Sequence, residues 1–362
     1  MQTIRQWLSA WVNRLLPNSQ AVSFALLLLF GGLAVVSLGR ILMPVFAAGI
    51  IAYLLEGLVA MGVRQRLPRL AAVIIVFIFF MTMVAIILVG LLPLLYNQTE
   101  QLIGQIPAMV NSGQSIVMQL PHRYPRLITQ DQINEIMGSV RQELVGYGQA
   151  MLGYSYASIV SFITLIVYLI LVPLLVFFFM KDKEAIARWA GQFMPEDRYL
   201  SLQVWREVDN QIGNYVRGKF FEVGVLLVAS YITFSVMGLN YSLLLAVLMG
   251  LSVIIPYIGA TLVTFPVMIV AFFQWGFSDD FWYLMLAYGI IQTVDGVVLI
   301  PLLFSEVVNL HPVAIMVAIL FFGGIWGFWG VFFAIPLATL VHSVLTAWPR
   351  ISEESGDQIP TS

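Results

Sequence analysis

Long apolar runs alternate with shorter polar segments along the whole chain. A helix needs about 20 apolar residues to cross the hydrocarbon core of a bilayer, and several runs have about that length. The clearest are Ala21–Gly39, Ile41–Met61, Leu70–Leu95, Tyr156–Met180, Phe220–Gly238 and Phe281–Leu303. The pattern predicts an all-α fold, that of a polytopic helical integral membrane protein with about six spanning helices.

Two further apolar runs, Ser242–Gln274 and Val313–Thr346, are too long for one comfortable span and short for two. The first is interrupted near its middle by Pro256–Gly259, and the second by the glycine-rich segment Gly323–Gly330. Glycine and proline permit a bend inside a membrane only where protein or water satisfies the freed backbone groups. We therefore expect two glycine/proline-broken helical hairpins, either re-entrant or fully spanning.

The polar segments set the expected domain boundaries. Residues 1–18 show an amphipathic pattern that suits either the membrane interface or packing against the protein's own core. The other expected regions are the first three transmembrane helices (19–95), an extracytoplasmic helical cap (96–155), the fourth transmembrane helix (156–180), cytoplasmic amphipathic helices (181–219), a C-terminal transmembrane core with both broken hairpins (220–348) and a disordered tail (349–362).

Composition narrows the class of protein. The 362 residues are 60% hydrophobic and 10% charged, with a mean hydropathy of +0.93, which excludes a soluble domain of this size. Basic residues gather on one side of the predicted membrane, so the positive-inside rule puts both termini in the cytoplasm. A net charge of −2 suggests no nucleic-acid partner. With no cysteine and three histidines, neither a disulfide nor a structural zinc site is expected.

Motifs for nucleotide binding and catalysis are missing. Gly213–Phe220 matches a Walker A pattern except at its last position, where Phe220 lacks the hydroxyl that would hold magnesium. Neither a metalloprotease HExxH nor a GxSxG pattern occurs. Asp295 has no second aspartate within the predicted bilayer with which to form a proteolytic pair. We expect no enzymatic activity, no nucleotide partner, no metal and no cofactor.

Asp295 is the strongest candidate for a functional residue. It lies near the middle of the apolar run Phe281–Leu303, where a carboxylate costs roughly 2.5–3.5 kcal/mol on insertion scales. Gln292 precedes it by one helical turn, and Gly296 and Pro301 would loosen the helix beside it. Such a residue marks a conduction or coupling site, or alternatively a structural aspartate bonded to a neighbouring helix.

Other ionisable residues are weaker candidates for coupling. Glu56 could take part or could extend toward the interface, and Glu222 is either a coupling residue or an interfacial carboxylate paired with basic neighbours. Glu306 follows the last predicted span. His311 could sense cytoplasmic pH or could bond a helix end. The residues expected to break or hinge helices are Pro256, Gly259, Gly296, Pro301, Pro312, Gly323, Gly324, Gly327, Gly330 and Pro336.

Several segments of the last 140 or so residues resemble one known family. They are Tyr215–Lys219, Ile255–Gly259, Gln292–Gly296, Pro301–Pro312 and Gly323–Pro336. Together they are similar to the C-terminal signature of the autoinducer-2 exporter family, in its PerM-like permease branch. The resemblance extends in topology over most of the chain.

The resemblance implies a multi-pass permease of the bacterial inner membrane that forms a homo-oligomer, with a pentamer as one state. Family members are proposed to export autoinducer-2 or to exchange sodium for protons. This chain departs from many relatives in having Gly296 for asparagine, Ala260 for proline and Lys219 for glutamine. Because of these departures, the substrate of a relative cannot be assigned to this chain from the resemblance.

Three functions follow as hypotheses. The first is a secondary transporter for a small molecule or cation, with gradient-driven efflux coupled to protons or sodium through Asp295. The second is a passive pore or channel along an oligomer axis, with Gly323–Phe333 as a hydrophobic gate. The third is a non-transporting membrane assembly factor that docks partners on 96–155 and 181–215. The expected partners are the lipid bilayer, a small-molecule or ion substrate and further copies of this chain.

Overall fold

The computed structural model describes residues 19–117, 138, 155–192, 199–256, 258–304 and 310–347. All regular secondary structure in these ranges is helical, and the protein is an all-α, polytopic membrane protein. Five described segments are long and apolar enough to cross a membrane: Ile41–Arg64, Arg69–Gly113, Ile212–Val236, Ile258–Trp275 and Asp279–Phe304. Shorter apolar helices cover Val167–Lys181, Ser242–Ser252 and Pro312–Trp326.

The chain divides into two compact units. Unit 1 consists of Met1–Leu58, Phe178–Phe221 and Leu299–Ser362, and unit 2 consists of Val59–Phe177 and Glu222–Val298. Each unit therefore combines segments that lie far apart in the sequence.

Unit 1 is organised around the second broken run. Its helices include α8 (Lys183–Gly191), the first part of α9 (Tyr199–Val236), α13 (Ile300–Phe304), α14 (Pro312–Trp326), α15 (Phe328–Phe332) and α16 (Ala334–Ala347). The side chains of its core are mostly apolar and come from α9, α13, α14 and α16. They are Tyr215, Val216, Phe304, Ile315, Ala318, Ile319, Ala334 and Ile335.

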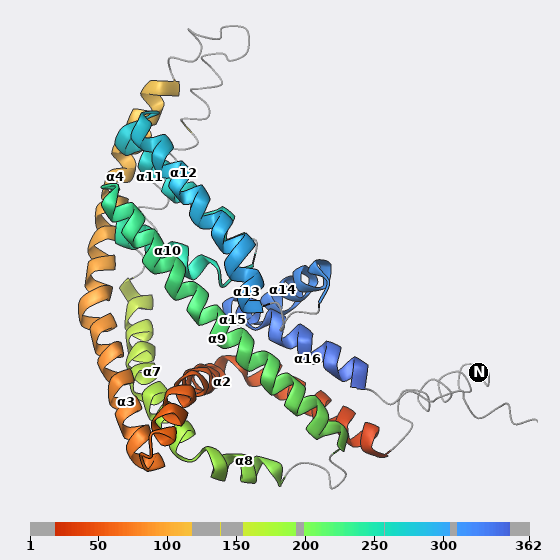
Figure 1. Ribbon diagram of the computed structural model, residues 1–362. Coiled ribbons are helices and arrows are strands. Elements are labelled where there is room, and N and C mark those ends of the chain that lie inside the picture. The colour runs from red at the N-terminus through yellow and green to blue at the C-terminus, as the bar shows by residue number, and fades with distance from the viewer. Residues whose placement is uncertain are drawn as a thin grey trace, which may run out of the picture. The chain divides into compact units, whose positions relative to one another are not determined.

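Helices α14, α15 and α16 fold back on one another, as expected for a broken hairpin (Figure 1). His311 and Pro312 start α14, and Gly327 ends it with φ +60° and ψ −134°, a conformation that only glycine adopts readily. Gly330 packs directly against the carbonyl of Phe322. Gly323 and Gly324 lie inside α14, so the chain bends at Gly327 instead.

Unit 2 contains α3 (Arg69–Ile86), η1 (Ile87–Leu91), α4 (Leu92–Val117), most of α7 (Ser155–Lys181), the rest of α9, α10 (Ser242–Ser252), α11 (Ile258–Trp275), α12 (Asp279–Val294) and the π-helical turn η2 (Asp295–Leu299), which ends one residue beyond it. The first broken run forms α10 and α11, which pack against each other across a short irregular link. Gly259 touches the carbonyl of Ser252 at this link.

Two helices are longer than the sequence predicts. α2 runs without a turn from Ser19 to Arg64, although separate spans were expected on either side of Arg40. Likewise, α3, η1 and α4 continue past residue 95, where the cap was expected to begin. A helix satisfies its own backbone groups inside a membrane, and here it continues through Pro44 in α2 and Pro107 in α4. The expectation that both termini lie in the cytoplasm assumed two membrane crossings separated by a turn at Arg40, and α2 has no turn there.

The expected interfacial helix 1–18 and tail 349–362 lie outside the described residues, as does most of 118–154.

We predict that Gly330→Ala destabilises unit 1 by about 1–3 kcal/mol, because its new methyl group would overlap the Phe322 carbonyl. Gly324→Ala is the matched control, since the space around its Cβ position is open and alanine favours the helix. Thermal unfolding of the purified protein in detergent measures both. Equal melting temperatures for the two variants would contradict the packing described at Gly330.

Candidate functional site

A chain of polar groups connects α11 and α12 inside unit 2. Gln292 Nε2 donates to Tyr288 Oη at 2.7 Å, and the hydroxyls of Tyr288 and Thr264 are 2.9 Å apart. Thr264 Oγ1 donates to the Ala260 carbonyl at 2.9 Å. Tyr288 Oη also lies 3.3 Å from the Ala260 carbonyl, and either hydroxyl can donate to the other. In both arrangements the donation begins at Gln292 Nε2 and ends on the Ala260 carbonyl.

Local helix geometry brings these groups together. Ala260 and Thr264 are four residues apart on α11, as are Tyr288 and Gln292 on α12, so each pair shares one helix face. A three-residue link with Gly276 at φ +63° joins the two helices, which pack as antiparallel neighbours (Figure 1). Tyr288 is only 5% exposed, and its ring stacks on Phe234 of α9 at a centroid distance of 6.4 Å.

Beside this polar chain lies an open cavity of about 310 Å³. Its lining combines three polar side chains with apolar ones and includes no charged group: Ala260, Thr261, Thr264, Phe265, Met268 and Gln292. Gln292 is half-buried and forms part of both the polar chain and the cavity wall. The cavity can therefore offer hydrogen bonds and apolar contact, without charge, to a bound molecule.

Asp295 lies one turn beyond Gln292 and is 5% exposed. It opens η2, where the helix widens to a π-helical turn. Pro301, which follows η2 closely, has no N–H to donate to Val297 four residues earlier, and a widened turn relieves the clash of its ring. Single π turns inside α-helices occur frequently at functional sites. The helix predicted to be loosened around Gly296 and Pro301 is thus irregular, beginning at the buried carboxylate.

Glu222 is more deeply buried than an interfacial carboxylate would be. Its exposed fraction is 1%, on the part of α9 that belongs to unit 2. Gly250 of α10 packs against α9 so closely that a Cβ there would lie 2.9 Å from the Val223 carbonyl. Its neighbour Met249 receives a weak hydrogen bond from Gln292, at 3.5 Å. One turn of α10 thus touches α9 next to Glu222 and α12 one turn before Asp295.

The remaining ionisable residues predicted to take part in coupling belong to unit 1 or are not described. Glu56 forms an ion pair with Lys183 at 3.5 Å. His311 Nδ1 accepts the backbone N–H of Val313 at 3.2 Å and so caps α14. Glu306 lies outside the described residues. Among the residues that the structure describes, no group of three or more His, Cys, Asp or Glu side chains could hold a metal ion.

Tyr288 and Thr264 were missed in the sequence because both lie in runs that count as apolar. The available signal was their spacing: Tyr288 stands four residues before Gln292, and Thr264 four after Ala260. Spacing within one helix does not reveal which neighbouring helix it meets, so the convergence of the two pairs could not be predicted.

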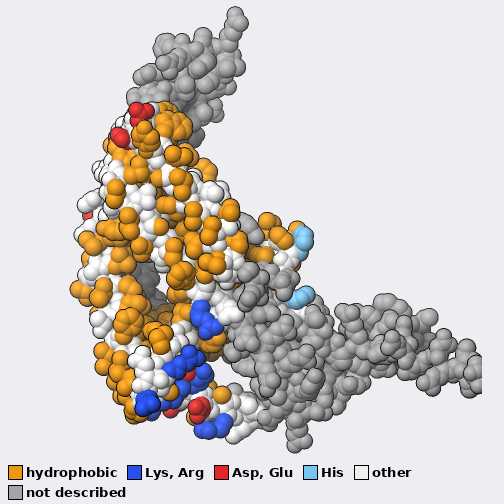
Figure 2. All heavy atoms as spheres, in the orientation of Figure 1, with side chains coloured by type: hydrophobic (Ala, Val, Ile, Leu, Met, Phe, Trp, Pro, Cys, Tyr) orange, Lys and Arg blue, Asp and Glu red, His pale blue; other side chains and the backbone are white. Residues whose placement is uncertain are grey.

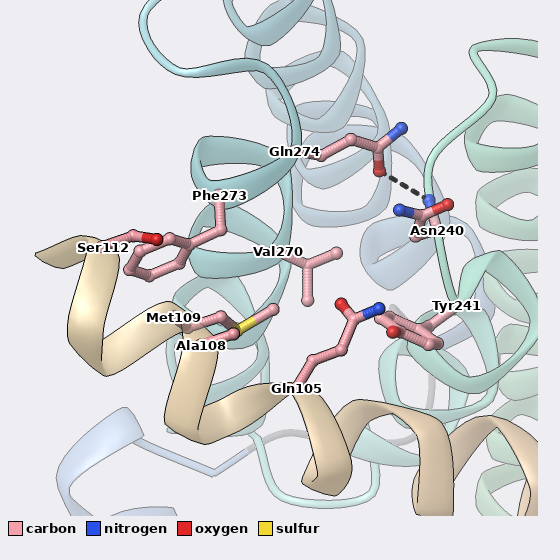
Figure 3. Close-up of a pocket in the computed structure, with 9 residues that line it drawn as sticks. All are labelled: Gln105, Ala108, Met109, Ser112, Asn240, Tyr241, Val270, Phe273 and Gln274. Carbon is pink, nitrogen blue, oxygen red and sulfur yellow. Dashed lines mark hydrogen bonds between the residues drawn. The ribbon is translucent and has the colours of Figure 1, made fainter.

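A second, smaller cavity of about 150 Å³ lies between α4, α11 and the turn that joins α9 to α10. Figure 3 shows Gln274 bonded to the backbone of Asn240, and the Gln274 amide also donates to the Gly238 carbonyl at 2.8 Å. Gln98 of α4 accepts the N–H of Leu244 at the start of α10. Burial raises the pKa of the Tyr241 phenol above its ordinary value of 10.0, so this turn residue is uncharged at neutral pH. These amides hold the turn in place.

Comparison with known proteins agrees with a transport role. Residues 23–350 match the model of the AI-2E family transporter. The chain is 42% identical over 355 residues to "Putative permease PerM" of Escherichia coli (strain K12), covering 96% of this chain and 99% of that protein. It is 24% identical over 316 residues to "Putative transport protein YueF" of Bacillus subtilis (strain 168), covering 85% and 84% of the two chains.

We predict that Tyr288→Phe lowers stability by about 1–3 kcal/mol, because the Gln292 N–H loses its 2.7 Å acceptor and Thr264 loses its bond to the phenol inside the membrane. Thr293→Val is the control, since Thr293 is exposed on the same helix and bonds only the carbonyl of Gly289. Thermal unfolding in detergent compares them. A Tyr288→Phe protein as stable as the control would show that the polar chain contributes little.

Proposed function

The chain belongs to the AI-2E transporter family, and from this membership we propose that it is a secondary transporter moving a small molecule or cation across the bacterial inner membrane. The 42% identity to a protein of Escherichia coli, over nearly the full length of both chains, supports a bacterial inner-membrane location. A homo-oligomer, as family resemblance implies, is part of the proposal.

The buried carboxylate of Asp295 is the single observation that carries this function. A charge at 5% exposure within a membrane-spanning helix is expensive unless it is used or neutralised. Taking up a proton or a cation removes that cost, so the occupied and empty states of Asp295 differ strongly in energy. Such a difference is what couples an ion gradient to a conformational change.

The irregular turn η2 supports a conformational role. Its bonds span one residue more than those of an α-helix, and Pro301 follows it without an N–H to donate. Neutralising Asp295 changes the charge at the first residue of this turn. We propose that the turn lets the helix ends on either side of it shift during the transport cycle.

Glu222 would serve as the second ionisable group of the pathway. It is buried, and its neighbour Val223 meets the turn of α10 that also contacts Gln292 of α12, one turn before Asp295. Burying two charged carboxylates in one unit is costly, and a proton that moves between them would pass through the interior of unit 2.

We predict that Asp295→Asn lowers gradient-driven proton flux by about tenfold or more, because the amide takes up neither a proton nor a cation. Proteoliposomes loaded with a pH-sensitive dye measure the flux after an imposed sodium or pH gradient. Asp280→Asn is the matched control, since Asp280 is exposed at the start of α12.

Wild-type flux in the Asp295→Asn protein would remove this carboxylate from the mechanism. Unitary conductance steps in a planar bilayer, without saturable exchange, would replace the carrier with a passive pore.

A further inference from the structure

We propose that the 310 Å³ cavity between α11 and α12 opens to the lipid and binds an uncharged, mostly apolar molecule that carries one hydroxyl or N–H donor. This rests on the proposed function in one respect, namely that the bound molecule is the solute that the protein moves. The solute would then enter sideways from the bilayer.

The rim of the cavity lies on the apolar outer face of α11. Phe265 and Met268 line the cavity and are 57% and 40% exposed. Leu262 and Ile269, which share the helix face of Phe265, are also exposed. Since α11 is a candidate membrane span, an exposed apolar face of this kind contacts acyl chains. Figure 2 shows hydrophobic side chains spread widely over the described surface of the helices.

The inner wall of the cavity has a hydrogen-bond acceptor available. Gln292 Nε2 is used by Tyr288 and, weakly, by Met249. Among the described residues no hydrogen bond to Gln292 Oε1 is formed. Gln292 enters the polar chain through its Nε2 donor, so its Oε1 oxygen can still accept a hydrogen bond. A carbonyl oxygen inside hydrocarbon is stabilised by any donor that reaches it, which a bound hydroxyl or N–H would supply.

Size and charge define the class of molecule. An apolar cavity of about 150 Å³ holds benzene, so a cavity about twice as large holds on the order of a dozen non-hydrogen atoms. An ion would lose its hydration without gaining a charged partner, because the lining is uncharged. A sugar would bring more hydroxyls than the three polar side chains Thr261, Thr264 and Gln292 can pair.

Spin labels can test the lipid-facing opening, because the chain has no cysteine and accepts single labels cleanly. In nanodiscs, a label at Met268→Cys should collide readily with oxygen and poorly with a water-soluble nickel chelate. A label at Asp280→Cys should show the reverse. High nickel access at Met268→Cys would mean a water-filled cavity, and low access to both reagents would mean that another subunit covers it. Either result overturns the proposal.

Binding can be tested with 1-decanol as the probe and undecane as the matched compound without a hydroxyl. Radiolabelled probe is partitioned between protein-loaded and empty nanodiscs. We expect saturable decanol binding at one site per chain, which Gln292→Leu weakens about tenfold, as the loss of one hydrogen bond predicts. Met268→Trp should block binding by filling the rim while leaving the polar chain intact.

Equal binding of undecane, or decanol binding unchanged in both variants, would overturn the site. Asp295→Asn separates this proposal from the transport mechanism, because Asp295 does not line the cavity. Decanol binding retained in that variant, with flux lost, supports both. If the wild-type protein does not bind decanol but shows flux that depends on Asp295, only the lipid-facing site is rejected.

Discussion

Hydrocarbon offers no hydrogen bonds, and this constraint governs the whole structure. A polar group within the spans is therefore stabilised wherever it finds a partner inside the protein. Where the chain turns from α9 into α10, side-chain amides of Gln98 and Gln274 bond backbone groups that the turn exposes. Where α14 begins, the His311 ring does the same. At the break between α10 and α11 the backbone bonds itself in tight local turns, as from Ile255 N–H to the Ser252 carbonyl. Helix ends and breaks are thus completed by side chains in some places and by the local backbone in others.

The same constraint explains why the candidate site is conspicuous. Its polar groups form a chain that ends on a backbone carbonyl, and Gln292, Thr264 and Ala260 of this chain also line a cavity. Two buried carboxylates, Glu222 and Asp295, lie in the same unit. The polar chain, Glu222 and Asp295 each cost free energy in a membrane, and all three occur in unit 2. This favours one common functional role over three independent structural ones.

The sequence predicted the features that depend on composition and on single residues. Apolar runs gave the all-α membrane class, and glycine and proline marked both broken hairpins. Asp295 and Gln292 stood out as polar residues in an apolar run. The continuity of α2 through Arg40 was not predictable, because span length alone suggests a turn there. The meeting of Tyr288 with Thr264 depends on how two helices rotate against each other, which no periodicity within one helix specifies.

The π-helical turn at Asp295–Leu299 has a consequence for the helix that contains it. One additional residue in the turn rotates everything beyond it relative to α12 by roughly the angle of a single residue. Side chains before and after the turn therefore follow different azimuthal phases, and the stripe facing the protein interior changes position at the carboxylate. If the turn tightened to an α-helix, α13 would have to rotate about its axis while the protein's covalent length stayed the same. A local change in helical winding would thus rotate the segment that follows the turn.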